Sequence, residues 1–202
     1  KNDRENHSEM FRDAVVFLAQ SCVVKKKKKT INSGKFIATF LMGTQKLYEF
    51  VNNNTDVVMM SVDQVNDPYV IGQHNNMISI NSALQVDLMG QVNAEMIGGR
   101  QFSGIGGQVD FVRGASRSCG GKSIIALPST ASGGTISRIA IELDRGAAVS
   151  TSRNDVHCIV TEFGVANLRG KSLRERACAL IAIAHPDFRS SLEAAAKAKG
   201  IL

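Results

Sequence analysis

Three glutamates lie beside turns or strand ends and could act as carboxylate nucleophiles. Glu9 follows His7 and Ser8 in NHSEMF, Glu142 lies in IAIELD, and Glu162 ends the apolar run CIVTEFG. A carboxylate can form a covalent acyl intermediate when it is desolvated and held beside groups that stabilise an oxyanion. A solvated surface acid has the same sequence pattern, so the residues alone leave the choice among the three open.

The segment FSGIGGQVDF (102–111) has glycine at positions 104, 106 and 107. Glycine lets another group approach the backbone closely. A dinucleotide-binding fingerprint is excluded because Val109 stands where its last glycine should be, and GGKS (120–123) is no P-loop because Ser116 replaces the required glycine. The segment therefore predicts either a tight turn or a place where a reacting carbonyl meets the backbone, followed by a strand-like stretch.

Other catalytic chemistries have less support. There is no G-x-S-x-G motif, and the four histidines show no paired spacing, so a serine nucleophile and a His-based metal site are disfavoured. The four cysteines (Cys22, Cys119, Cys158 and Cys178) are scattered, with no C-x-x-C. This pattern predicts neither a disulfide framework nor a zinc site, and it fits a reducing compartment.

The positive charge of the chain is concentrated in one place. The 202 residues include 24 Lys and Arg against 18 Asp and Glu, and Lys25–Lys29 with Lys35 account for the whole excess. A nucleic-acid-binding protein spreads its cations over a face and interleaves aromatic residues, whereas this chain has no Trp and two Tyr. We expect the lysine run to be a solvated loop; attraction of an anionic ligand is the alternative. No apolar run has membrane-spanning length, and the first ten residues are too polar for a signal peptide.

Apolar spacing and turn residues predict the elements that must position these groups. Helices are expected at 8–23 (capped by Ser8 or Asp3), 44–54 (capped by Thr44), 172–185 (begun by Ser172) and 188–200. Strands are expected at 36–41, 57–61, 77–83, 84–92, 123–129, 137–143, 147–151 and 157–164. Strands in the middle and helices at both ends predict a single α/β domain over 1–202, with a mixed β-sheet covered by helices.

In order along almost the whole chain, the sequence resembles the C-terminal half of the acetyl-CoA hydrolase/transferase family, and in particular 4-hydroxybutyrate CoA-transferase-like enzymes. The resemblance rests on HSEMFRD, GKFIATFLMGTQKLYEFV, VNDPYVIGQHNNMISINSALQVDLMGQV, FSGIGGQVDFVRGASRS, GGKSIIALPSTASGGTISRI, SRNDVHCIVTEFGVANLRGKSLRERA and AIAHPDF. It implies a CoA-transferase-like C-terminal domain whose subunit also has an N-terminal half that this chain lacks.

The resemblance also implies a mechanism and the residues that carry it. The glutamate of HSEM, Glu9, attacks the acyl-CoA thioester, and a glutamyl-CoA thioester follows, which a second carboxylic acid accepts. Asn66, in VNDPY, is the implied side-chain donor to the thioester oxygen, and Gly107 is the implied backbone donor. The implied CoA-binding positions are Leu84, Ser103, Gly106, Gly107 and Ser132.

These residues lead to a prediction of an acyl-CoA:carboxylate CoA-transferase that uses acetyl-CoA with 4-hydroxybutyrate or a similar short acid and needs no metal. The alternatives are an acetyl-CoA hydrolase, or a non-catalytic CoA-binding half that requires its N-terminal partner. The resemblance implies a homo-oligomer, namely a dimer, with acyl-CoA and short carboxylic acids as ligands. It implies no nucleic-acid or membrane partner and a cytoplasmic location, or a mitochondrial one in a eukaryotic cell.

Overall fold

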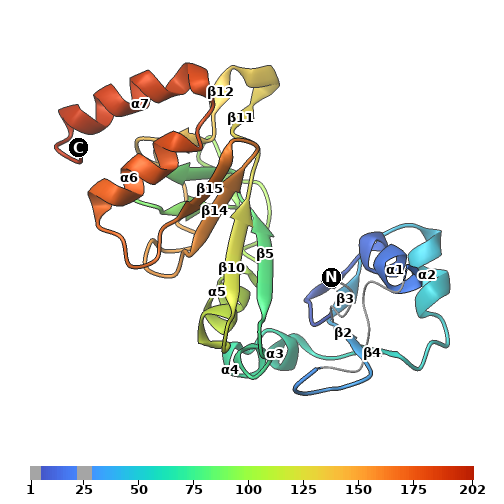
Figure 1. Ribbon diagram of the computed structural model, residues 1–202. Coiled ribbons are helices and arrows are strands. Elements are labelled where there is room, and N and C mark those ends of the chain that lie inside the picture. The colour runs from blue at the N-terminus through green and yellow to red at the C-terminus, as the bar shows by residue number, and fades with distance from the viewer. Residues whose placement is uncertain (1–5, 22–28) are drawn as a thin grey trace. The chain divides into compact units, whose positions relative to one another are not determined.

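The computed structural model describes residues 6–21 and 29–202, and it divides into two compact units. Unit 1 comprises residues 1–77 and 113–121, and unit 2 comprises residues 78–112 and 122–202. The single α/β domain expected from the sequence is therefore built as two units. Their elements can be followed along the chain in Figure 1. Within the described ranges, no helix combines the length and apolar character needed to cross a bilayer.

Unit 1 contains short parallel strands. Strand β1 (Met10–Phe11) pairs with β3 (Phe40–Leu41), and β2 (Phe36–Ala38) pairs with β4 (Val57–Met59). An isolated bridge between His7 and Ile37 extends the first pairing toward the N-terminus. The single strand expected at 36–41 is thus two strands, β2 and β3, interrupted at Thr39, where the amides of residues 39 and 40 both bond to the Glu9 carbonyl.

Helices α1 (Asp13–Gln20) and α2 (Gln45–Val51) complete unit 1, with the short helices α3 (Val62–Val65) and α4 (Pro68–Gly72). The first helix begins later than residue 8, because residues 10 and 11 form β1; its N-cap is Arg12 rather than Ser8, and Asp3 lies outside the described residues. The Asp13 carboxylate accepts hydrogen bonds from the Thr44 amide (3.0 Å) and hydroxyl (2.8 Å), tying together the starts of α1 and α2. The unit's apolar core comprises Phe11, Val16, Phe36, Ala38 and Leu47.

Unit 2 is built on a four-stranded sheet in the order β15-β14-β10-β5. Strands β5 (Ile78–Ser82), β10 (Lys122–Ala126) and β14 (Cys158–Thr161) are parallel, and β15 (Gly164–Asn167) is antiparallel to β14. The sheet is therefore mixed, as expected. Unit 2 also contains a three-stranded sheet, in the order β13 (Ile139–Ala140), β6 (Gln85–Asp87) and β7 (Val92–Asn93).

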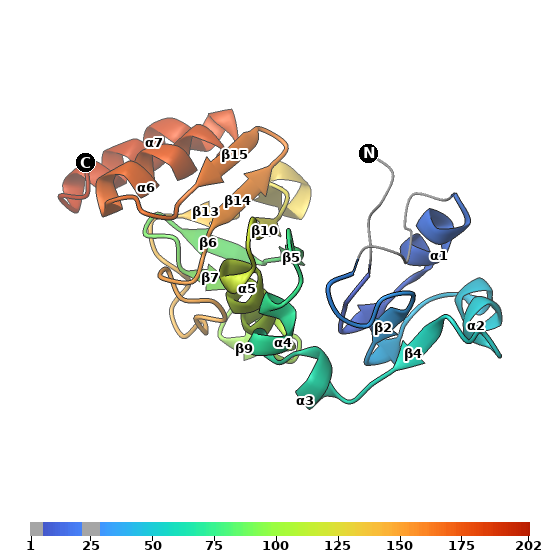
Figure 2. The ribbon, with the colours of Figure 1, turned by 60° about the horizontal axis from the view of Figure 1, so that its bottom comes forward.

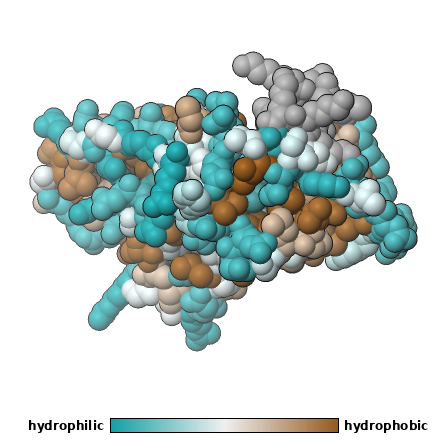
Figure 3. Space-filling model, turned by 90° about the horizontal axis from the view of Figure 1, so that it is seen from below, coloured by the Kyte–Doolittle hydropathy of each residue, from teal (hydrophilic) through white to brown (hydrophobic). Residues whose placement is uncertain are grey.

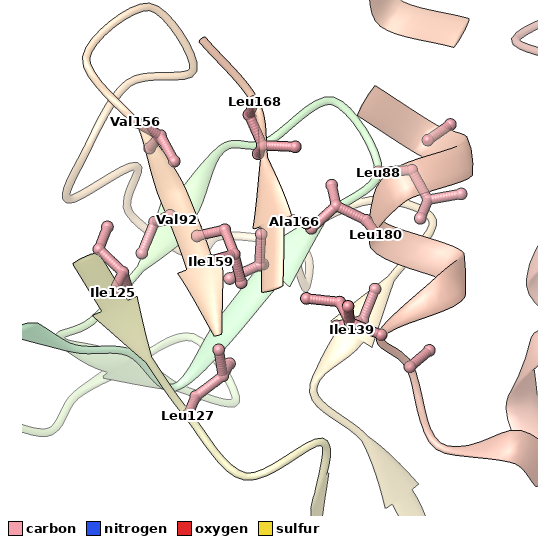
Figure 4. Packing of buried hydrophobic residues seen from close by; sticks show 14 of the residues in the cluster. Leu88, Val92, Ile125, Leu127, Ile139, Val156, Ile159, Ala166, Leu168 and Leu180 are labelled. Atoms are coloured by element: carbon pink, nitrogen blue, oxygen red, sulfur yellow. The ribbon is translucent and has the colours of Figure 1, made fainter. Parts of the chain in front are cut away.

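Helices α6 (Leu173–Ala182) and α7 (Pro186–Ala198) close the core of unit 2 (Figure 2). Ser172 caps α6 through a capping box with Glu175, which confirms the predicted start of this helix. Ile125, Ile159 and Ala166 from the sheet belong to one buried cluster with Leu180 of α6, and Figure 4 shows these side chains together. Aliphatic side chains from both layers thus make a continuous apolar interior.

The glycine segment leads into a helix, so the strand-like stretch predicted after it is wrong. Helix α5 (Gln108–Arg117) buries Phe111, Val112 and Ala115, which are spaced three and four residues apart. Two hairpins lie on either side of this helix in the sequence: β8 (Met96–Ile97) with β9 (Arg100–Gln101), and β11 (Thr130–Ala131) with β12 (Ile136–Ser137). The short 3-10 helix η1 (Ser132–Gly134) connects β11 and β12.

Two further strand predictions need correction. The single strand expected at 84–92 is interrupted: residues 85–87 form β6 and Val92 begins β7. The residues between them turn, and Asp87 accepts hydrogen bonds from the amides of Met89 (3.0 Å) and Gln91 (2.8 Å). The strand expected at 147–151 is reduced to an isolated bridge between Thr151 and Val92.

Arg176 of α6 ties this turn to the helix. Its side chain is buried, and its guanidinium donates to the carbonyls of Lys171 (3.2 Å), Met89 (3.3 Å) and Arg153 (2.7 Å). Burial, and secondarily the neighbouring Arg153, lowers the pKa of Arg176. Neutral carbonyl oxygens from three separate segments therefore satisfy this buried cation.

Replacing Arg176 with Met is expected to lower the free energy of unfolding by about 2–4 kcal/mol, because hydrogen bonds made by a charged donor are lost and buried carbonyls remain. Chemical denaturation followed by circular dichroism would measure the change. Arg174→Met is the matched control, since Arg174 is exposed on the same helix. Equal stability of the two variants would contradict a clamping role for Arg176.

Candidate active site

The HSEM segment is held in place by backbone hydrogen bonds within unit 1. The Glu9 carbonyl accepts from the amides of Thr39 (2.8 Å) and Phe40 (3.0 Å), and the Ser8 amide donates to the Ile37 carbonyl (3.1 Å). The Ser8 hydroxyl bonds to the Met10 carbonyl (3.0 Å). The side chain of Glu9 is partly exposed. The backbone of Glu9 is therefore fixed by hydrogen bonds, while its side chain keeps partial access to solvent.

His7 joins this segment to the one that contains Asn66. Its Nε2 lies 2.8 Å from the Val65 carbonyl oxygen. A carbonyl can only accept, so Nε2 carries the proton and donates. This hydrogen bond connects the two candidate segments, because His7 lies two residues before Glu9 and Val65 lies directly before Asn66.

Asn66 itself is buried at the end of α3. Its side chain is 7% exposed, and its amide N–H donates to the Val62 carbonyl (2.8 Å). Its Oδ1 is buried and accepts no hydrogen bond from the residues that the structure describes. Most buried polar atoms in proteins are hydrogen-bonded, so this oxygen is a candidate to accept a hydrogen bond from a ligand; the amide NH₂ is the group that could donate.

A second imidazole packs on the first. The rings of His7 and His74 lie 4.7 Å apart between centroids, and His74 is anchored through its carbonyl, which accepts from the Ser118 hydroxyl (2.5 Å). Burial lowers the pKa of His7 from 6.5, the bond to Val65 opposes this effect, and Lys29 adds to the lowering. Burial, His7 and Lys29 lower the pKa of His74 to about 4. Both rings are therefore neutral at pH 7.

Lys29 departs from the solvated loop expected for the lysine run. It is buried at 9% exposure, and its Nζ donates to the Lys35 carbonyl (3.0 Å). Lys25–Lys28 lie outside the described residues, so the expectation of a solvated loop remains a prediction for them. Lys29 is therefore a buried, hydrogen-bonded residue, contrary to the expectation for the run.

The buried His pair predicts that unit 1 loses stability in mild acid. The pKa of His74 is about 4 in the fold and near 6.5 when unfolded, so the unfolded chain binds a proton as pH falls below 6.5 while the folded chain does not. We expect the melting temperature to fall by on the order of 5 °C between pH 7 and pH 5. In His74→Gln the fall should be smaller but not absent, because His7 still titrates.

The measurement is thermal unfolding by circular dichroism across that pH range. His185→Gln is the control, because His185 is a partly exposed histidine in unit 2 beside Asp187. An identical pH dependence in His74→Gln and the unaltered chain would show that His74 does not cause it.

The glycine loop lies in unit 2 and ends at the start of α5. The Glu95 carbonyl accepts from the amides of Phe102 (2.7 Å) and Ser103 (3.2 Å). The positive φ of the loop belongs to Gly106 (+58°). Gly107 is buried, and its carbonyl accepts the Phe111 amide (3.1 Å) of α5. Backbone amides at a helix start carry partial positive charge and favour negative charge on a ligand.

The other predicted CoA-binding residues are also in unit 2. Leu84 is partly exposed, and its amide donates to the Asn93 carbonyl (2.9 Å). Ser103 is exposed, with its hydroxyl 3.2 Å from the Gly104 carbonyl oxygen. Ser132 is exposed at a φ of +50° in η1. Each position is accessible, and none is used for core packing.

The two competing glutamates have structural partners. Glu142 forms an ion pair with Lys199. Glu162 accepts hydrogen bonds from the Ser129 amide (2.9 Å) and hydroxyl (2.6 Å). The Ser129 hydroxyl is the main cause of the lowered pKa of Glu162. These contacts favour a structural role for both residues.

Unit 1 thus contains Glu9 and Asn66, and unit 2 contains the five predicted CoA-binding residues. The sequence analysis missed His74, Lys29 and the role of His7. Only the position of His7 in HSEM, two residues before the proposed nucleophile Glu9, could have indicated its role from the sequence. In the described ranges, no group of three or more His, Cys, Asp or Glu residues is arranged to hold a metal ion.

Comparison with known proteins gives consistent matches. The model of the acetyl-CoA hydrolase/transferase C-terminal domain matches residues 43–196. The 4-hydroxybutyrate coenzyme A transferase of Clostridium kluyveri is 62% identical over 186 residues, which cover 92% of this chain and 43% of that protein. The chain therefore spans less than half the length of this curated relative.

Solved structures agree with this match. RipA from Yersinia pestis superposes with a TM-score of 0.95 at 48% identity, covering 100% of this chain and 46% of RipA. The 4-hydroxybutyrate CoA-transferase from Porphyromonas gingivalis gives a TM-score of 0.85 at 46% identity, covering 98% of this chain and 46% of that structure. The α/β fold is thus shared with CoA-transferase structures.

Proposed function

The chain belongs to the acetyl-CoA hydrolase/transferase family, and from this premise we propose that it is the nucleophile-bearing half of an acyl-CoA:carboxylate CoA-transferase. The observation that carries the proposal is the placement of Glu9. Its backbone is fixed by two hydrogen bonds to its carbonyl, and its segment is tied to that of Asn66 through His7 and Val65.

The proposed reaction begins when the Glu9 carboxylate attacks the acyl-CoA carbonyl. The thioester C–S bond breaks, giving an acyl-glutamyl anhydride and CoA thiolate. The thiolate attacks the glutamyl carbonyl of the anhydride, so the acyl group leaves as a carboxylate and a glutamyl-CoA thioester remains. An incoming carboxylate repeats these two steps in reverse, which yields the new acyl-CoA and regenerates Glu9.

Two donors are proposed to stabilise the negative oxygen that develops at each attack. Asn66 would donate through its side-chain amide and Gly107 through its backbone N–H. Leu84, Ser103, Gly106 and Ser132 would contact CoA. The carboxylate and these donors account for each step of the transfer without a metal ion.

The proposed donor is acetyl-CoA, in line with the family's description. The proposed acceptor is 4-hydroxybutyrate or a similar short acid, because the Clostridium and Porphyromonas relatives are named 4-hydroxybutyrate CoA transferases. The alternative acceptor is water, which would make the protein an acetyl-CoA hydrolase; the family name covers both reactions. We further propose that activity requires the N-terminal half of the subunit, because the relatives are more than twice as long.

The test is to incubate the subunit containing both halves with acetyl-CoA and trap the intermediate with hydroxylamine or borohydride. Mass spectrometry should then find the modification at Glu9. Transfer of CoA to an added acid supports the transferase, whereas release of free CoA and acetate without an acid supports the hydrolase. Absence of any modification at Glu9 would contradict both and favour a non-catalytic CoA-binding half.

A further inference from the structure

The four-stranded sheet of unit 2 has one face that the rest of unit 2 covers. Ile125 of β10, Ile159 of β14 and Ala166 of β15 are at most 1% exposed. They pack in the cluster that includes Leu180 of α6 and Leu192 of α7. In Figures 1 and 2, α6 lies next to β15 and α7 lies next to α6.

The opposite face of this sheet is accessible and carries several aliphatic side chains. Successive strand residues point to opposite faces, so the neighbours of the buried residues share the other side. The open face, as we define it, consists of Ile78, Ile80, Ile124, Val160 and Val165. Ile80 is 67% exposed, Val165 64% and Ile78 50%, and Ile124 and Val160 are partly exposed.

The strand register places these side chains beside one another. Ile80 is the partner of Ile124 across β5 and β10, and Val160 is the partner of Val165 across β14 and β15. Cys158, the partner of Ile124 on β14, fills the position between the two pairs. The aliphatic side chains of the open face therefore lie close together, and Lys122, the partner of Ile78, and Asn167, the partner of Cys158, share the same face at its margins. Figure 3, a view from below, shows apolar side chains in several groups among hydrophilic ones.

Two general properties of proteins indicate that another layer of structure covers the open face. Sheets with parallel strands, such as β5, β10 and β14, are almost always covered on both faces. Contiguous apolar patches on a protein surface mark interaction sites. A flat aliphatic sheet face packs best against another layer of secondary structure with an apolar side of its own.

The length of the relatives indicates which segment could cover the open face. This chain corresponds to 43% of the Clostridium protein and 46% of RipA, so each relative has a larger remainder that must pack somewhere. We propose that the open face is the surface on which the N-terminal half of the subunit packs. This inference rests on the proposed function only in taking that half to be part of the working subunit.

The experiment compares the same variants in two proteins, the 202-residue chain and the subunit that contains both halves. Ile80→Lys and Val165→Lys each place a charge on the open face. In the 202-residue chain both should leave the melting temperature unchanged, because the side chains are exposed there. In the two-half subunit each should lower it by about 5 °C or more, because a lysine must then be buried. Val149→Lys is the control in both proteins, since Val149 is 48% exposed and lies outside the sheet.

Other occupants give different results. If Ile80→Lys and Val165→Lys destabilise the 202-residue chain itself, the chain covers its own face and the proposal is wrong. If that chain sediments as a dimer that these variants dissociate, a second copy is the partner and the proposal is again wrong. Unchanged melting of both variants in the two-half subunit would also overturn it. The Glu9 adduct is measured separately, so failure of the proposed chemistry would not alter these outcomes.

Discussion

The variant Glu9→Gln is expected to abolish CoA transfer, lowering kcat on the order of 10⁴-fold or more, the scale of losing a catalytic nucleophile. An amide oxygen is a poor nucleophile, so neither the anhydride nor the glutamyl thioester can form. Glu9→Asp should fail for a different reason, because a side chain one methylene shorter cannot reach the thioester carbonyl from a backbone that Thr39 and Phe40 hold in place.

Steady-state transfer from acetyl-CoA to an added acid, in the subunit with both halves, measures the effect. Glu162→Gln is the matched control, because Glu162 bonds to Ser129 and is expected to support the loop that follows rather than the reaction. Normal turnover by Glu9→Gln together with loss of turnover in Glu162→Gln would assign the nucleophile to Glu162 instead. Thermal melts of both variants exclude unfolding as the cause.

The second large effect is expected at the glycine loop. Gly107→Ala should lower kcat/KM by about 10²–10³-fold, because a methyl group would displace the thioester from the backbone donor proposed there. The positive φ of the loop belongs to Gly106, so backbone strain is expected in Gly106→Ala rather than in Gly107→Ala. Asn66→Ala should show a loss of similar size, since Asn66 is the proposed partner donor.

Gly104→Ala provides the control for this loop, because a Cβ added at Gly104 meets no atom within 4 Å. Kinetics and melting temperatures should be measured together for all four variants. A catalytic role for Gly107 predicts lost activity per folded molecule, whereas a structural turn predicts lower stability with preserved kcat/KM. Unchanged kcat/KM in Gly107→Ala would remove Gly107 from the site.

Local sequence signals predicted several elements correctly. Ser172 and Glu175 mark the start of α6 because a capping box is made within four residues and needs no distant partner. The runs that became β5, β10 and β14 were recognisable because strands of a parallel sheet are short and rich in aliphatic residues. The family, and with it the choice of Glu9, Asn66 and the glycine loop, came from motifs in their order along the chain.

Features that depend on distant contacts were not predictable in this way. The residues after Gly107 alternate like a strand at Val109 and Phe111, and only the burial of Val112 and Ala115 in the fold shows the helical period of α5. Lys29 belongs to a charged run that suggests solvent exposure, yet the fold buries it where it can bond to the Lys35 carbonyl. Such burial depends on which segments the chain brings together.

The sequence by itself therefore determined the family, the mixed α/β composition and the identity of the residues proposed for chemistry, because each rests on a local motif. Only the tertiary structure decided how those residues are supported. The bond from His7 to Val65 and the tilted ring contact of His7 with His74 join residues 58 and 67 positions apart, and no local propensity specifies contacts over such separations. The same holds for the open face of Ile80 and Val165, because whether a strand residue meets a helix or solvent depends on which layers pack against each side of the sheet.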